Sequence, residues 1–167
     1  MAKYLTTLLV KRPIEETFAF VSNFHNAATW DPRTYSAEKY TPGPVGLGTI
    51  FILRGGMLPK GTLPSFTDRF VAQPLPYEIK VFTPPRRFVL VGQTPQFDYR
   101  DDLDFTAEGD HTRLQYAATL SFRGIFRLGE PVLRLLFQRI GDDATRHLAR
   151  AVEAATPART TTADVAS

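Results

Sequence analysis

The chain has 167 residues, of which 43% are hydrophobic and 22% are charged, and these values are typical of one globular domain. Its 20 basic and 17 acidic residues give a net charge of +3 and are scattered along the sequence. This scatter argues against a nucleic-acid partner, because such proteins gather their basic residues on one face. The absence of cysteine excludes disulfides, thiolate catalysis and cysteine-ligated metal sites.

The first thirty residues predict a strand followed by one or two short helices. Residues 3–10 are apolar and rich in β-formers, and the run is too short for a secretory or membrane-spanning segment. We therefore expect a cytoplasmic protein without stable membrane insertion. Pro13 suits the first turn of an amphipathic helix. A second helical turn over residues 24–30 is expected to stop where Asp31 precedes Pro32.

From residue 33 to residue 123 the pattern changes to strands and turns, which predicts an antiparallel sheet of six to seven strands. We interpret residues 73–76, with the sequence QPLP, as a turn between two strands, and residues 55–64 as a long hairpin tip. The predicted strands in this region are residues 34–40, 49–54, 65–72, 77–82, 88–92, 97–105 and 113–122.

The C-terminal part predicts one long helix that begins near the step from Glu130 to Pro131 and ends before Pro157. Apolar residues recur there at steps of three and four, which marks a buried stripe on a helix. The stripe consists of Ile125, Leu128, Val132, Leu136, Ile140, Ala144, Leu148 and Val152. Residues 157–167 are small and polar and predict a disordered tail, so the expected domain covers residues 1–156.

This order of elements resembles the START-like (SRPBCC, helix-grip) superfamily, and more narrowly its polyketide cyclase/dehydrase-like branch. The resemblance covers about residues 3–153 and is carried by the order and spacing of several pieces, among them VKRPIEETFAFVSNF, WDP, GPVGLGT, VFTPPRRFVLVG and LGEPVLRLLFQRIGDDATRHLARAV. It implies an α+β helix-grip fold, in which a strongly bent antiparallel sheet wraps around a long C-terminal helix. The superfamily includes lipid and sterol carriers, plant ligand binders and aromatic polyketide cyclases, and shares no universal catalytic residue.

The resemblance implies two classes of function. The first is the binding or transport of a hydrophobic or aromatic small molecule, lipid or polyketide-like, in a cavity between the sheet and the C-terminal helix. The alternative is a polyketide cyclase/dehydratase-type enzyme that needs no cofactor. An interaction module with a filled core is a third interpretation. We expect a hydrophobic small molecule as partner, and a monomer or a homodimer.

Two patterns predict the residues that line the cavity. They are the inward-facing positions of the alternating strands and the apolar stripe of the long helix. The predicted lining residues are Phe51, Leu53, Phe97, Tyr99, Leu103, Tyr116, Leu120, Val132, Leu136 and Ile140. Residues near the opening of the cavity are expected to control entry, because mobile loops over a rigid sheet are where ligands enter. These entrance residues are His25, Trp30, Met57 and Leu58.

The candidate catalytic residues are Asp101 and Tyr99. A period of two places both on the apolar face of residues 97–105, which should point to the concave side of the sheet. A carboxyl desolvated among aromatic rings has a raised pKa and can act as a general acid or base. Alternatively, Asp101 pairs with an arginine, for instance Arg54, or a β-bulge turns it outward.

The three histidines, His25, His111 and His147, are dispersed and lack paired spacing, so we expect no metal site. His25 and Asp31 could form an acid–base couple. The competing interpretation, which we favour, is that Trp30 packs the short helix onto the sheet while Asp31 starts a turn. The sequence also lacks a phosphate-binding glycine loop, a nucleophile elbow and a dinucleotide fingerprint.

Overall fold

The computed structural model describes residues 1–56, 59–62, 73–124 and 130–155, with the backbone alone at 130–134 and 136. Among these residues the chain forms one antiparallel sheet in the order β1-β7-β6-β5-β4-β3-β2. The strands are β1 (Ala2–Val10), β2 (Thr34–Lys39), β3 (Ile50–Gly55), β4 (Gln73–Thr83), β5 (Arg87–Gln93), β6 (Phe97–Glu108) and β7 (His111–Phe122). Three short helices, α1 (Ile14–Ser22), η1 (Phe24–Asn26) and α2 (Ala27–Trp30), follow β1, and α4 (Glu130–Ala154) follows β7.

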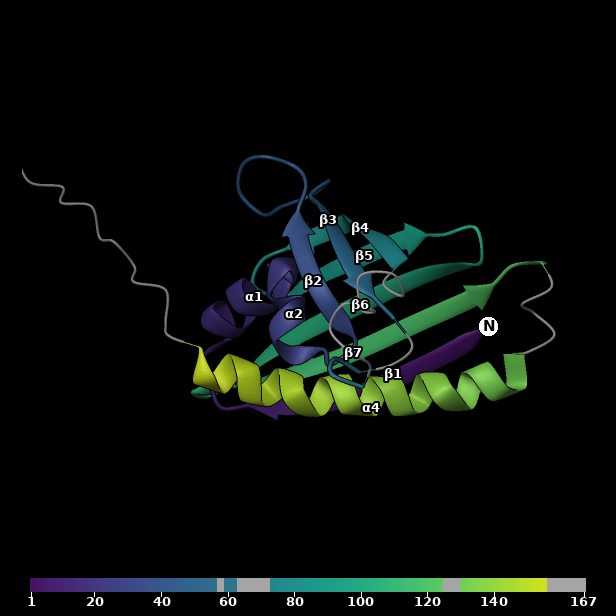
Figure 1. Cartoon of the computed structure of the whole chain (residues 1–167). Helices are drawn as coiled ribbons and strands as arrows, with labels where there is room; N and C mark the ends of the chain where they lie inside the picture. Colours follow the sequence, from purple (N-terminus) through teal and green to yellow (C-terminus); the bar gives the residue numbers. More distant parts are fainter. Residues whose placement is uncertain (57–58, 63–72, 125–129, 156–167) are drawn as a thin grey trace, which may run out of the picture.

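Figure 1 shows α4 lying along the curved sheet, with α1 and α2 near the C-terminal end of this helix. The predicted α+β helix-grip fold is confirmed, including the strand before the short helices and the single long C-terminal helix. The predicted strand over residues 65–72 lies outside the described residues. The predicted tail, residues 157–167, lies outside them as well.

One predicted turn is wrong. Residues 73–76 are the first part of β4, where Pro74 pairs with Arg54 and Pro76 pairs with Ile52 of β3. The register between β4 and β5 begins only at Glu78, so both prolines lie in a part of β4 that is paired with β3 alone. Proline is tolerated in a strand at such an edge, because its missing N–H removes no hydrogen bond from a second ladder.

Gly92 on β5 lies in very close contact with its neighbours on β4 and β6. Gly92 pairs with Tyr99, and the tyrosine ring lies directly over the glycine. A Cβ atom at residue 92 would lie 2.4 Å from carbons of the Tyr99 ring and 2.0 Å from the Pro76 carbonyl oxygen. Glycine is therefore required at this position for the strands to approach. β4 has a register shift between Ile79 and Val81, an irregularity of the kind that bends a strand locally.

A cluster of aromatic rings packs beneath α1. Phe18 on α1 is 4% exposed and its ring centroid lies 5.2 Å from that of Phe105, 5.5 Å from that of Phe82 and 5.7 Å from that of Phe88. These distances fall in the range of favourable edge-to-face and tilted ring pairs. The cluster fixes α1 against β4, β5 and β6.

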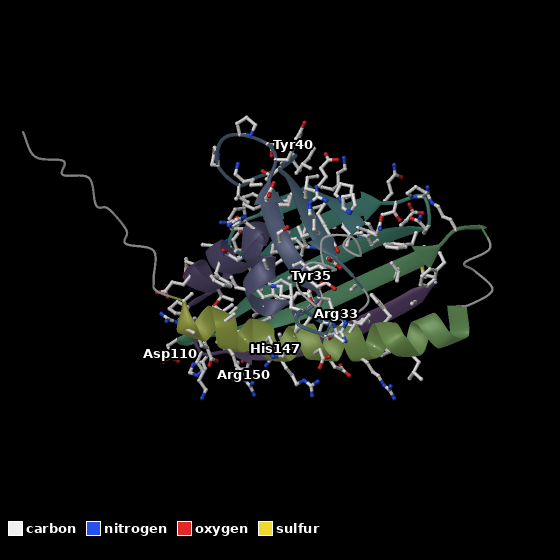
Figure 2. All side chains as sticks on the ribbon, viewed as in Figure 1. Arg33, Tyr35, Tyr40, Asp110, His147 and Arg150 are labelled. Atoms are coloured by element: carbon white, nitrogen blue, oxygen red, sulfur yellow. The ribbon has the colours of Figure 1, made fainter. Side chains whose placement is uncertain are left out.

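Polar contacts hold the C-terminal half of α4 against β1 and the segments that follow it. The Tyr4 hydroxyl donates to an Asp142 carboxylate oxygen at 3.0 Å, and the Tyr4 ring lies where a side chain on Gly141 would be. Arg33 forms an ion pair with Asp143 at 3.2 Å, and Figure 2 shows Arg33 close to α4. These contacts place the concave side of the sheet opposite the middle of α4.

The last turn of α4 is capped by Arg12, which follows β1. Its guanidinium donates to the backbone carbonyls of Glu153 at 2.8 Å and Ala155 at 2.9 Å. A cation at a helix C-terminus also interacts favourably with the helix dipole. Within the described part of the chain, no helix combines the length and the apolar character needed to cross a membrane.

Candidate functional site

A cavity of about 120 Å³ lies between the concave side of the sheet and α4. Residues from α4, from the short helices and from five strands form its wall. The wall consists of Tyr4, Phe24, Ala27, Trp30, Asp31, Leu53, Tyr77, Asp101, Tyr116, Ala118, Phe137, Ile140, Gly141 and Ala144. The cavity is thus mostly apolar and aromatic, with two carboxyl groups in its wall.

Asp101 on β6 lies in this wall and is 6% exposed. Its neighbours on β5 and β7 are Leu90 and Ala118, within an unbroken register, so no bulge turns the side chain outward. Arg54 is exposed and lies on the other face of β3 from the buried Phe51 and Leu53. The structure thus places the Asp101 carboxyl toward the cavity.

The pKa of Asp101 is raised to about 7, mainly because burial disfavours the charged form; a hydrogen bond from Tyr116 opposes this rise, and the nearby Asp31 carboxylate adds to it. Tyr116 on β7 is opposite Leu103, and its hydroxyl reaches the Asp101 carboxyl diagonally across the two strands. The pKa of the Tyr116 hydroxyl is raised well above its usual range by burial and by Asp101. Tyr116 therefore serves as a hydrogen-bond donor that orients Asp101.

Asp31 ends α2 and forms the turn into β2. One of its carboxylate oxygens accepts from the Arg33 backbone N–H at 3.0 Å, and the other accepts from the Thr34 hydroxyl at 2.5 Å. Both donors fix the carboxylate as an acceptor in the cavity wall. The predicted turn at Asp31 is found here, and His25 on η1 is exposed.

Two further tyrosines lie side by side near Asp101. The ring centroids of Tyr77 and Tyr99 are 4.5 Å apart, and burial raises the pKa of both hydroxyls. Tyr77 lines the cavity, whereas Tyr99 does not. The Tyr99 hydroxyl donates to the backbone carbonyl of Pro76, so this candidate catalytic group is engaged by the sheet itself.

The structure distributes the other predicted lining residues over several places. Leu53, Tyr116 and Ile140 line the cavity. Phe51 and Leu103 are fully buried but are not part of the wall. Phe97 and Leu120 are half-buried on β6 and β7. The side chains of Val132 and Leu136 lie outside the described residues.

Among the predicted entrance residues, Trp30 lies in the cavity wall and its ring packs edge-on against Phe24 at 5.9 Å. Its indole N–H is buried without a hydrogen-bond partner among the described residues. That leaves the hydrogen-bonding capacity of the donor unused. Met57 and Leu58 lie outside the described residues.

Sequence reasoning missed several wall residues, most notably Tyr77 and Phe137. Tyr77 follows Leu75 and precedes Ile79 at a period of two, a signal that was present but was hidden by the interpretation of residues 73–76 as a turn. Phe137 falls just beside the expected helix stripe. Gly141 could not be predicted as a wall residue, because its close contact with the Tyr4 ring depends on which strand faces the helix.

Two histidines lie away from the cavity. His111 is next to Asp110 at the turn between β6 and β7, and its ring contacts the Asp110 carboxylate. His147 on α4 is exposed, and its Nδ1 atom lies 2.7 Å from the Asp143 carbonyl oxygen one turn earlier. Across the described residues, no group of three or more His, Asp or Glu side chains is arranged to hold a metal ion.

The sequence profile of a family described as polyketide cyclase / dehydrase and lipid transport matches residues 1–153. No curated protein sequence matches the chain. Three solved structures, each below 25% identity, agree with the fold. The protein TTHA0849 from Thermus thermophilus is 16% identical with a TM-score of 0.68, over 92% of this chain and 99% of that chain.

A START superfamily protein from Mycobacterium smegmatis is 15% identical with a TM-score of 0.64, over 92% of this chain and 95% of that chain. The Zhui aromatase/cyclase from Streptomyces sp. R1128 is 13% identical with a TM-score of 0.66, over 90% of each chain. At these identities the likeness establishes the shared architecture and leaves the chemistry to be argued from the cavity.

Proposed function

Since the chain belongs to the family described as polyketide cyclase / dehydrase and lipid transport, we propose that it binds or carries a hydrophobic or aromatic small molecule between its sheet and α4. The observation that carries this proposal is the mostly apolar cavity between these two elements. Its volume of about 120 Å³ is close to the ~150 Å³ apolar cavity that takes up benzene. A ligand with several fused rings would require its wall to open.

The chain provides its own probe for this proposal, because its only tryptophan, Trp30, is in the cavity wall. Selective excitation of Trp30 during a titration with toluene should give a saturable change in intensity or emission maximum. Ala118→Leu, which adds volume inside the cavity, should abolish the change. Ala117→Leu is the matched control, because the adjacent residue points to the other face of the same strand and should leave the titration intact.

Equal responses from the two variants, or no saturable response in the unmodified protein, would contradict the proposal. Thermal melts of both variants show whether each is folded before titration. The melts are needed because a larger side chain in the core can destabilise the protein as well as fill the cavity. A variant that stays folded but no longer responds to toluene has lost the cavity and not the fold.

A second candidate function is a polyketide cyclase/dehydratase-type reaction that needs no cofactor, and Asp101 is the observation that favours it. A carboxyl with a pKa of about 7 in a cavity wall is present in both protonation states near neutrality, which is what general acid–base catalysis requires. Protonated Asp101 would donate to a leaving hydroxyl, and ionised Asp101 would take a proton from a carbon beside a carbonyl. Asp101→Asn should then abolish turnover of a poly-β-carbonyl substrate analogue and spare its binding.

The remaining expectations about the chain are part of the same proposal. We infer that it works in the cytoplasm, as a monomer or a homodimer, and without a nucleic-acid partner. The absence of cysteine and the scattered basic residues support this. The mass in solution would check the oligomeric state. A lack of retention on heparin at physiological salt would support the absence of a nucleic-acid partner.

A further inference from the structure

The charges in the cavity wall have one sign. Among the described residues, the carboxyls of Asp31 and Asp101 are the acidic groups in the wall besides the tyrosine hydroxyls, and no Lys, Arg or His lines the cavity. A ligand with a carboxylate would place a further acidic group beside these two carboxyls in a desolvated space, without a cation among the described wall residues to pair with it. Such an arrangement is costly, because buried charges need partners.

The two carboxyls differ in their remaining hydrogen-bonding capacity. Asp31 already receives one donor on each oxygen, from the Arg33 backbone and the Thr34 side chain. For Asp101 the hydrogen bond from Tyr116 is the side-chain contact found among the described residues. A carboxyl group offers about four acceptor positions, so Asp101 retains positions for a donor from a ligand.

Resting on the function proposed above, we propose that the ligand presents a hydrogen-bond donor, either a hydroxyl or a protonated amine, to the Asp101 carboxyl, and that the cavity rejects carboxylates. Tyr116 acts as a positioning residue, because it holds one side of the carboxyl while the ligand approaches another. The apolar wall, with Leu53 from β3 and Ile140 from α4, accepts the rest of the molecule. Selectivity thus comes from an unfavourable charge as well as from a favourable hydrogen bond.

The test uses four ring-sized probes that differ in one group: toluene, benzyl alcohol, benzylamine and benzoate. Each is titrated against the full-length protein near neutral pH, with Trp30 fluorescence as the readout. We expect benzyl alcohol or benzylamine to bind at least ~10-fold more tightly than benzoate, a factor that corresponds to about 1.4 kcal/mol. The alcohol and amine arms show which donor the cavity prefers.

Variants at one position assign the selectivity to Asp101. Asp101→Leu should reverse the order, so that toluene binds more tightly than the alcohol and the amine. Asp101→Asn should weaken the amine more than the alcohol, because an amide oxygen still accepts a hydrogen bond but carries no charge. The matched control is Asp104→Asn, which alters an exposed carboxyl on the other face of β6 and should leave all four affinities unchanged.

The outcomes separate this inference from the function on which it rests. If toluene binds but benzoate binds as tightly as the alcohol and the amine, the cavity takes ligands and the donor proposal is overturned. Unchanged selectivity in both Asp101 variants would overturn it too. If none of the four probes binds, the proposed function itself fails, and the donor proposal fails with it.

Discussion

The two halves of the interior are built from similar residues and pack differently. Under α1, Phe18 is surrounded by phenylalanine rings at centroid distances of 5.2–5.7 Å. Under α2 and α4, rings such as Tyr77 and Trp30 surround a cavity with Asp101 in its wall. The first region has no polar side-chain atoms on its rings, whereas the second contains hydroxyl and carboxyl groups. We interpret the ring cluster as a source of stability, and the cavity with its hydroxyl and carboxyl groups as the place where the proposed ligand binds.

Of the changes that test this comparison, Phe18→Ala should have the largest effect on stability. Removing this buried aromatic side chain from the ring cluster under α1 should lower the free energy of unfolding by about 3–5 kcal/mol. Denaturant melts measure the loss, and toluene titration at low temperature should still report an intact cavity. Leu9→Ala, at a site that is 55% exposed on β1, is the control and should change stability by less than ~0.5 kcal/mol. A loss below ~1 kcal/mol for Phe18→Ala would contradict the assignment.

Asp101→Asn tests the other half of the interior. The folded pKa of Asp101 is about 7 against an ordinary value of 3.8, so the unfolded chain loses this proton first as the pH rises. Below 3.8 both states are protonated and Asp101 costs nothing. Between 3.8 and about 7 the folded protein becomes progressively less stable because of this residue, and above about 7 the cost is constant.

Relative to the unmodified protein, Asp101→Asn should therefore become more stable as the pH rises through this window, by ~1–3 kcal/mol at mildly alkaline pH. Urea melts at a series of pH values give the difference directly. Asp104→Asn, on the exposed face of the same strand, should show no such trend. A mutant that is less stable than the parent at alkaline pH would mean that the carboxylate is stabilised by a charged partner in the folded protein.

Arg12→Ala tests the place where the end of α4 meets α1, because Arg12 also contacts Glu16 on α1. The guanidinium caps the last turn of α4 through the carbonyls of Glu153 and Ala155, so its removal should cost ~1–2 kcal/mol. Hydrogen exchange of the last turn of α4 should speed up, and toluene binding should be unchanged. Arg146→Ala is the control, since the contact of this residue among the described residues is an exposed ion pair within α4, which should contribute less than ~0.5 kcal/mol. Equal effects of the two changes would show that Arg12 does not cap the helix.

The fold was predictable because each element has a clear period in the sequence. Alternation in residues 97–105 and 113–122 and the helical stripe after residue 130 are strong signals, and they placed the concave face correctly. The turn predicted over residues 73–76 was wrong, because two prolines in four residues indicate a turn unless the neighbouring strand is known. Only the register shows that these prolines lie where β4 pairs with β3 alone.

The candidate site was predictable in part. A period of two was enough to orient Asp101 toward the concave side, but not to identify its partner. Asp101 neither pairs with Arg54 nor is turned outward by a bulge. Its contact is with Tyr116, and this contact depends on the diagonal offset between β6 and β7. Tyr4 and Gly141 are 137 residues apart in sequence, and their contact requires α4 to cross β1. Such long-range juxtapositions leave no trace in local periodicity.

The most direct measurement is the titration of the Asp101 carboxyl carbon by NMR, without ligand and with toluene added. A carboxyl that lines an apolar cavity should titrate near the pKa of about 7, and toluene should raise that pKa further, because the ligand displaces water from beside the group. Asp101→Asn identifies the resonance by removing it. A carboxyl that titrates near or below 3.8, with or without toluene, would contradict the account.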